Sequence, residues 1–496
     1  MAKLINWKLI ARVIGLLVLL EAALLLVTTV VSLCYGESDT QALAISCLII
    51  GIASGVLIAC GRGSLGNMGP RESNIIVALI WMVMSLFGML PFWLSGAIPN
   101  ITNAMFESVS GLSTTGSTVL NNIEELPRGL LLWRSVLQWV GGLGVVVLSL
   151  VILPFISSGK QLYVAEMSGF TYKKVAPRLK DTGRRLMTLY LTLTLAAILT
   201  YWLLGMELFD AVCHGFATVS SGGFSTKQNS ISYWDNKPLL QYAVIFYMLL
   251  SGISFVLLYW MLFKHEFRKI FKDEELRTFL LIACGTTLFV FLVVSFFPAD
   301  ASMEIHSFAD FERNFRHALF QSVSTISSTG YYSYDYLSWP PIVWMVLVFF
   351  VMIIGGSAGS ASGGIKVSRV LLVTKMALHE LNRRIHPNAV FPASINKITI
   401  EPKLIQSTNS FFAFYIFILV VGTFLMVANG VEPFEAVGNA ISSLSNAGPS
   451  VGQYGPSGSF YALPMFSKWV MMFLMLIGRL EIFTFLIIFT PALWKK

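Results

Sequence analysis

The chain is short of charge and of cysteine. Only 12% of its 496 residues are Asp, Glu, Lys or Arg, while 55% are hydrophobic. A soluble globular domain carries roughly 25% charged residues, so this composition excludes an ordinary soluble fold. The cysteines (Cys34, Cys47, Cys60, Cys213 and Cys284) show neither a C-x-x-C motif nor Cys/His ligand spacing. They predict packing residues, and neither a disulfide framework nor a metal site.

What the chain has in quantity is long apolar segments. A helix needs about 20 apolar residues to cross a bilayer. Candidate spans fall near residues 9–34, 41–60, 74–95, 131–155, 186–206, 239–263, 277–298, 341–375, 409–430 and 466–493. The first is too long for the apolar part of a signal peptide, and we expect it to be retained. The sequence therefore predicts an all-α polytopic membrane protein with about ten transmembrane helices.

The basic residues are distributed unevenly between the two sides of this predicted topology. Of the 34 Lys and Arg residues, 26 fall on the side that holds both termini. The positive-inside rule then predicts that both termini are cytoplasmic. Because the charge follows topology, we expect no nucleic-acid partner, although the net charge is +8.

A short motif occurs four times, each time as small polar residues that end in a glycine. The copies are residues 113–116, 220–223, 327–330 and 445–448, and each follows a mildly apolar segment too short to span a bilayer. Residues 104–110 and 318–324 resemble each other before the first and third copies, as 209–212 and 434–437 do before the second and fourth. The pattern predicts four half-helices that enter the membrane and turn back.

Such turns suit the binding of a dehydrated cation. Glycine accepts positive φ and lets backbones converge, and converging carbonyls replace the water around a small ion. The other interpretation is four small-residue helix-packing sites. The predicted filter residues are Thr114, Thr115, Gly116, Ser221, Gly222, Gly223, Ser328, Thr329, Gly330, Asn446, Ala447 and Gly448.

The chain thus divides into two extra N-terminal helices and four units, each made of a span, a half-helix, a turn and a span. We expect the N-terminal pair in residues 1–70 and the four pore repeats in 71–158, 159–265, 266–400 and 401–496. Four such repeats predict a pseudo-fourfold pore within one chain.

The second span of the third repeat contains a run of glycines and serines that weakens a helix. The glycines are Gly355, Gly356, Gly359, Gly363 and Gly364. Irregular backbone at membrane depth is tolerated where it lines a cavity or is buried in protein. We expect a broken helix that forms a gate under the filter, and a plain packing stretch is the alternative.

Several charged or titratable residues lie near the half-helices. Glu107, Asp210 and Glu435 either raise the cation concentration at a pore mouth or are solvated loop charges. For His214 and His317 we expect packing or capping roles.

The four glycine-ended turns, Gly116, Gly223, Gly330 and Gly448, resemble the signature of the Trk, Ktr and HKT superfamily of potassium transporters. The match covers nearly the whole chain, and the two extra N-terminal spans resemble the TrkH-type bacterial subunit. The resemblance implies a preference for K⁺, because all four glycine positions are filled. It also implies an intramembrane gating loop at 355–364 and a pore-facing role for Arg479. For Arg479, a local pair with Glu481 or another carboxylate is the alternative.

The resemblance further implies a homodimer in the bacterial inner membrane. It implies a cytosolic TrkA-type nucleotide-binding ring, docked on basic loops such as 159–185 and 366–403. The chain has no G-x-G-x-x-G after a strand, so we expect it to bind no nucleotide itself.

The expected function is channel-like potassium uptake, with K⁺ as the transported and filter-bound ion and no reaction catalysed. A strictly coupled potassium:proton or potassium:sodium symporter remains open. A membrane-embedded enzyme would need nucleophiles, bases or metal ligands gathered at one depth, and the sequence shows no such cluster.

Overall fold

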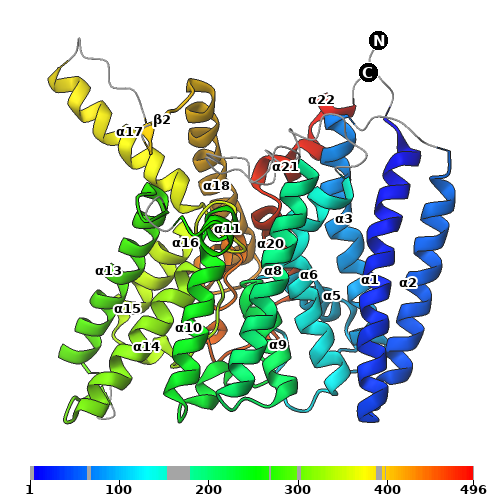
Figure 1. Ribbon diagram of the computed structural model, residues 1–496, viewed down its shortest axis with the longest axis horizontal. Helices are drawn as coiled ribbons and strands as arrows, with labels where there is room; N and C mark the ends of the chain where they lie inside the picture. Colours follow the sequence, from blue (N-terminus) through cyan, green and yellow to red (C-terminus); the bar gives the residue numbers. More distant parts are fainter. Residues whose placement is uncertain are drawn as a thin grey trace.

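The computed structural model describes residues 5–63, 69–152, 179–266, 270–298, 303–386, 394–396 and 398–494. Most of these residues are helical (Figure 1). Long apolar runs favour helices in a membrane, because a helix pairs all of its backbone groups within one segment. The prediction of an all-α fold is confirmed.

Along the chain, the helices form an N-terminal pair followed by four segments. The N-terminal pair is α1 (Trp7–Tyr35) and α2 (Thr40–Cys60). The first segment holds α3 (Pro70–Gly88), α4 (Leu90–Leu94), α5 (Ile101–Leu112) and α6 (Arg128–Ile152). The second holds α8 (Leu179–Leu203), α9 (Leu208–Val219), the short helix η2 (Ser230–Trp234), α10 (Pro238–Gly252) and α11 (Phe255–Lys264).

The third and fourth segments are more broken. The third holds α13 (Glu274–Phe296), α14 (Phe308–Ile326), η4 (Tyr336–Ser338), α15 (Pro341–Val346), the π-helical turn η5 (Leu347–Val351), α16 (Met352–Ile354) and α17 (Val367–Ile385). A hairpin of β1 (Ser394–Ile395) and β2 (Ile398–Thr399) follows. The fourth holds α18 (Pro402–Ala428), α19 (Pro433–Ser445), η6 (Gly452–Tyr454), α20 (Met465–Arg479), α21 (Ile482–Leu486), η7 (Ile487–Phe489) and α22 (Pro491–Trp494).

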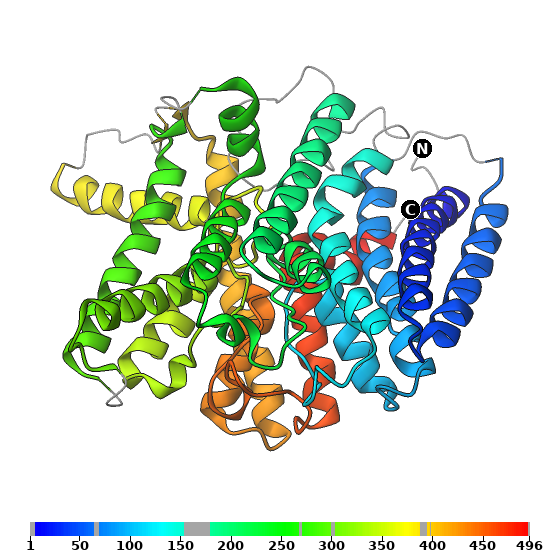
Figure 2. The same ribbon diagram turned by 60° about the horizontal axis from the view of Figure 1, so that its bottom comes forward.

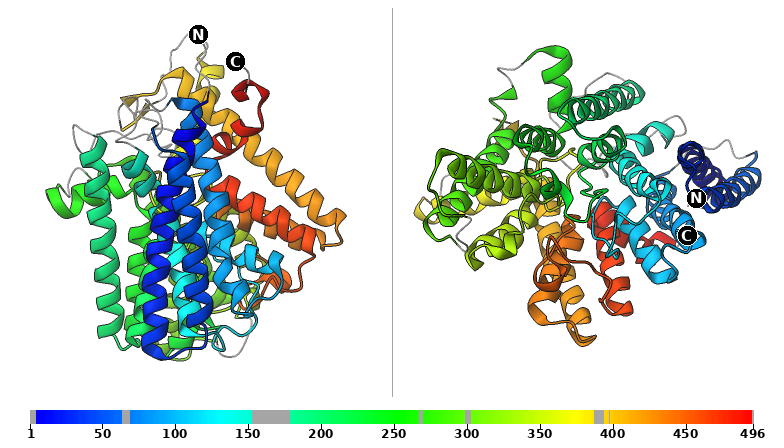
Figure 3. Two further views of the ribbon diagram at one scale, coloured as in Figure 1. Left: turned by 90° about the vertical axis from the view of Figure 1, so that its right-hand side faces the viewer. Right: turned by 90° about the horizontal axis from the view of Figure 1, so that it is seen from below.

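The four segments lie around a common centre, with α1 and α2 outside them (Figure 3, right). The tilted view shows the same arrangement (Figure 2). The N-terminal pair packs through α1 against α3 and α6 of the first segment. The rings of Trp7 and Trp494 stack at 6.2 Å between centroids, so α1 begins beside the place where α22 ends.

Within the described residues, six helices are long and apolar enough to cross a membrane, or up to eight if two bent pairs count as one span each. The bent pairs correct the sequence analysis, which treated residues 239–263 and 466–493 as single spans. The chain turns by 110° between α10 and α11, and by 116° between α20 and the helical stretch Ile482–Phe489.

Short helices α5, α9, α14 and α19 lead to the four motif copies, and most of their residues are buried. Polar side chains cap three of them, and Glu432 does so before α19 by accepting the N–H of Glu435 at 2.9 Å. The side chain of Asn100 accepts the N–H of Thr102 at 2.9 Å before α5, and Ser307 and Asp310 form a capping box before α14. These caps fix where α5, α14 and α19 begin, and the motif fixes where each of the four half-helices ends.

Candidate functional site

The four motif turns share one backbone conformation. The residue two positions before each glycine is left-handed: φ is 56° at Thr114, 54° at Ser221, 49° at Ser328 and 51° at Asn446. The glycines themselves have φ of 88°, 78°, 81° and 92° at Gly116, Gly223, Gly330 and Gly448. A non-glycine residue rarely adopts such angles, so their fourfold recurrence marks four equivalent turns.

Equivalent hydrogen bonds end the four half-helices. The N–H before each glycine donates to a carbonyl of the last helical turn: Thr115 to Ser110 (2.9 Å), Gly222 to Ala217 (2.8 Å), Thr329 to Ser324 (2.9 Å) and Ala447 to Ser442 (3.0 Å). This is the bond of a Schellman-type C-cap. Each turn is therefore fixed to a helix C-terminus, which carries a partial negative charge.

The four turns meet in a closed ring, here called the carbonyl ring (residues 113–116, 220–223, 327–330 and 445–448). A Cβ placed on any of the glycines would come closer than 3.0 Å to a carbonyl oxygen of the next turn. The pairs are Gly116 with Gly222 O, Gly223 with Thr329 O, Gly330 with Ala447 O, and Gly448 with Thr115 O. The fold therefore brings the four motif copies, far apart in the sequence, into one ring.

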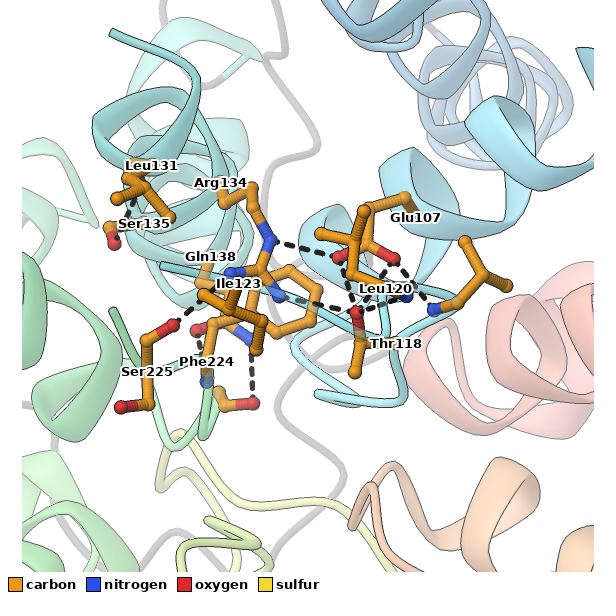
Figure 4. A network of polar contacts seen from close by, with 12 residues as sticks. Glu107, Thr118, Leu120, Ile123, Leu131, Arg134, Ser135, Gln138, Phe224 and Ser225 are labelled. Carbon is orange, nitrogen blue, oxygen red and sulfur yellow. Dashed lines mark hydrogen bonds and ion pairs between the residues drawn. The ribbon is translucent and has the colours of Figure 1, made fainter. Parts of the chain in front are cut away.

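Polar side chains bind the few residues that follow the turns of the carbonyl ring. In the first segment, Glu107 on α5 accepts from Thr118 Oγ1 at 3.0 Å and from the N–H of Val119 at 3.0 Å (Figure 4). Arg134 on α6 pairs with Glu107 at 2.8 Å, and both side chains are almost fully buried. In the second segment, the two ring nitrogens of His214 lie 2.8 Å from the carbonyl oxygen of Asp210 and 2.9 Å from Ser225 Oγ.

These contacts can be compared with the roles predicted for the acidic residues and histidines near the half-helices. Glu107 is fully buried and paired, so neither of its two predicted roles fits. Asp210 is also buried, and its carboxylate accepts from Thr226 Oγ1 at 2.7 Å. Glu435 accepts the N–H of Gln453 at 2.9 Å. The packing role expected of His214 agrees with its contacts, and His317 lies 2.9 Å from Ser333 Oγ through Nδ1.

A non-helical stretch, residues 355–366, interrupts the third segment and is here called the gate segment. It begins after α16 and ends where α17 starts, with φ of 70°, 71° and 80° at Gly355, Gly359 and Gly364. The N–H of Gly363 donates to Ser328 Oγ at 2.6 Å, and a Cβ on Gly363 would overlap the carbonyl oxygen of Ser445. The gate segment therefore lies against the third and fourth turns of the carbonyl ring.

The gate segment also pairs with the break in the second segment. Ser357 N–H donates to Gly252 O at 2.9 Å, and Phe255 N–H donates to Gly359 O at 3.0 Å. The backbone groups left open between α10 and α11 are thus satisfied by the gate segment, as membrane depth requires. The break between α10 and α11 and the gate segment stabilise each other.

Arg479, at the end of α20, joins the gate segment to the first segment. Its Nη1 donates to Ala361 O at 2.8 Å, and its Nη2 donates to Gly141 O on α6 at 2.7 Å. Glu481, in the break after α20, forms an ion pair with Arg369 at the start of α17. A half-buried guanidinium that binds carbonyls of two segments holds those segments together.

Two small cavities adjoin these elements. One of about 60 Å³ is lined by the four ring glycines and by residues that follow the turns, such as Ser117 and Ser225. Another of about 40 Å³ lies beside the gate segment and is lined by Gly363, Arg479 and Glu481 among others. One cavity thus adjoins the carbonyl ring, and the other adjoins the gate segment.

The chain matches the TrkH family, described as cation transport protein, over residues 40–496. It is 35% identical over 495 residues to the Trk system potassium uptake protein TrkH of Escherichia coli (strain K12), covering 99% of this chain and 100% of that protein. The Trk system potassium uptake protein TrkI of Halomonas elongata is 31% identical over 496 residues, with coverage of 99% and 98%.

The crystal structure of the potassium transporter TrkH from Vibrio parahaemolyticus superposes with a TM-score of 0.85. It is 32% identical and covers 98% of this chain and 99% of that one. These relatives are named as transport proteins, in agreement with the prediction that the chain is not an enzyme. With a family match across most of its length and full-length relatives, the chain belongs to the TrkH family of cation transport proteins.

Proposed function

We propose that this chain takes up potassium across the bacterial inner membrane, through a selectivity filter formed by the carbonyl ring. The observation that carries the proposal is the ring itself: four equivalent turns whose glycines each meet a carbonyl oxygen of the next turn. Carbonyl oxygens held at fixed spacing replace the hydration shell of K⁺. The C-termini of the four half-helices add negative potential at the same point. The names of the relatives supply the ion.

The proposed gate is the gate segment together with Arg479. Its backbone lies against the third and fourth turns, and Arg479 holds it to α6. The guanidinium also places a fixed positive charge next to the proposed cation path, which raises the energy of a passing ion. In this arrangement the path is closed below the filter, and opening requires the gate segment to leave the ring.

The remaining proposals concern the orientation of the chain in the membrane, its oligomeric state and its regulatory partner. We propose cytoplasmic termini from the positive-inside distribution, a homodimer, and control by a cytosolic TrkA-type nucleotide-binding ring. The name "Trk system", carried by the relatives, suits a multicomponent assembly. Of the basic loop 159–185, residues 159–178 lie outside the described residues, and the loop 366–403 begins with α17, whose last turn carries Arg383 and Arg384.

Uptake of rubidium into proteoliposomes, with sodium as competitor, tests the filter assignment. We expect Gly223→Ser to lower the discrimination against sodium, because the new Cβ would overlap the carbonyl oxygen of Thr329. Gly430→Ser is the matched control: its φ is 87°, yet a Cβ there meets nothing within 4 Å. Wild-type discrimination in folded Gly223→Ser would refute the filter assignment.

A further inference from the structure

The second turn of the carbonyl ring is held by a side chain from the neighbouring segment. Gln138, on α6, is fully buried. Its Nε2 donates to Gly222 O at 2.6 Å, and its Oε1 accepts the N–H of Phe224 at 3.0 Å (Figure 4). One amide therefore binds the backbone on both sides of Gly223, and the donor and acceptor roles fix its orientation.

Arg134, one helical turn before Gln138, extends this contact along the chain. Its Nη1 donates to Ser225 O at 3.1 Å, and its guanidinium carbon lies 4.1 Å from the centre of the Phe224 ring. Glu107 balances its charge. The two α6 side chains together fix the backbone at residues 222, 224 and 225.

The other three segments lack this pair. Gly141 and Gly478 occupy matching places, because a Cβ on either would overlap the carbonyl oxygen of the residue before its own turn, Leu112 or Leu444. Counted back from Gly141, Ser251, Gly355 and Gly478, the position of Gln138 is filled by Met248, Met352 and Met475. The position of Arg134 is filled by Val244, Val348 and Met471. None of these side chains donates a hydrogen bond to a carbonyl.

The second turn is adapted to Gln138 in its own sequence. The residue before the ring glycine is Thr115, Thr329 or Ala447 in the other turns, and Gly222 here. A Cβ on Gly222 would overlap Cδ of Gln138, so the missing side chain provides the space that the amide occupies. The Gln138–Gly222 pair is specific to one of the four positions.

We propose that Gln138 is a positioning residue that fixes the Gly222 carbonyl in the carbonyl ring and thereby sets its selectivity for K⁺ over the smaller Na⁺. This inference rests on the proposed function of the ring. A carbonyl oxygen has two lone pairs, so the Gln138 amide can bind one of them and leave the other for the ion. The same hydrogen bond resists movement of the carbonyl toward an ion smaller than K⁺. The helices beside the other three turns carry no amide at the matched position, so this restraint acts on the second turn.

The test uses the full chain in proteoliposomes, with rubidium as the transported probe and sodium as competitor. Gln138→Met installs the residue that α10 carries at the matched position, and Met248→Leu is the control. We expect Gln138→Met to lower rubidium-over-sodium discrimination about five-fold, the effect of losing a buried hydrogen bond, while rubidium uptake persists. Met248→Leu is expected to keep wild-type discrimination.

A double-mutant cycle provides an independent arm if Gln138→Met does not fold. Gly222→Ala places a methyl group where the Gln138 amide lies, and we expect a similar loss of discrimination. In a Gln138→Ala background the same change should cost little further, because the space is vacant and the bond already lost. Additive losses in this cycle would contradict the coupling.

The outcomes separate the two claims. Wild-type discrimination in both Gln138→Met and Gly222→Ala, with a loss in Gly223→Ser, overturns the role of Gln138 and leaves the filter intact. Wild-type discrimination in all three variants overturns both. A loss in the Gln138 and Gly222 variants at unchanged unfolding temperature supports the positioning role, since a merely structural defect would lower stability and total uptake together.

Discussion

Removing Arg479 perturbs the proposed gate at a single side chain. Its two hydrogen bonds, to Ala361 O and Gly141 O, connect the gate segment to α6. A hydrogen bond from a charged donor contributes roughly 1.5–3 kcal/mol, so the two favour the closed arrangement by about 3 kcal/mol at the low end. Arg479→Ala should then shift the ratio of open to closed chains on the order of 100-fold toward open.

Two further variants separate the bonds from the charge. Arg479→Lys keeps the positive charge and loses the two-pronged donor, so we expect about a tenfold rise in basal rubidium uptake. Arg479→Gln loses the positive charge and keeps one donor group. Comparing its basal rubidium uptake with that of Arg479→Lys distinguishes a barrier to ion passage caused by charge from one caused by the hydrogen bonds that hold the gate segment. Arg128→Ala is the control, because its ion pair with Glu207 lies at the surface.

The assay is the initial rate of rubidium uptake into proteoliposomes that contain the purified chain alone. Size-exclusion profiles and unfolding temperatures establish that each variant is folded. Basal uptake equal to or below wild type in folded Arg479→Ala would refute the assignment of Arg479 to the gate.

Further changes probe the packing that supports the path. Glu107→Ala leaves buried Arg134 without its carboxylate, so we expect the free energy of unfolding to fall by about 3–5 kcal/mol in denaturant titrations. Adding Arg134→Val, the residue type of the second and third segments, should recover part of that loss, and no recovery would argue against an unpaired charge as the cause. Gly363→Ala places a methyl group against Ser445 O, so the gate segment should leave the ring and basal rubidium uptake should rise; unchanged uptake would show that the gate segment does not close the path.

The carbonyl ring could be predicted because its signal is local and repeated. Each turn is encoded by a glycine after small polar residues at the end of a short helix, and four copies distinguish this signal from chance. The gate segment could also be predicted, since its glycines and serines stand out within an apolar run.

The breaks after Gly252 and Arg479 could not be predicted in the same way. At Gly252 the flanking Ser251 and Ser254 give only a weak signal within an apolar run, and the helix is interrupted because the gate segment, about a hundred residues later, pairs with its open backbone groups. At Glu481 the backbone has φ of 58°, and the residue pairs with Arg369 from the third segment. Pattern-based reasoning considers one segment at a time, whereas these breaks depend on two.

Gln138 and Arg134 were missed for a related reason. Within one apolar span they are isolated polar residues, and the sequence of that span alone gives them no partner. Their meaning appears when α6 is compared with the matching helices, which carry Met and Val at these positions, and when Gly222 is seen to make room for the amide.

The most direct test of the central claim is to locate the ion. Crystals of the full chain grown in rubidium allow an anomalous difference map at the rubidium absorption edge. The account predicts a peak at the centre of the carbonyl ring, among the carbonyl oxygens of Thr115, Gly222, Thr329 and Ala447, that weakens in Gly223→Ser. Rubidium peaks found only away from the ring, with the four turns well ordered, would contradict it.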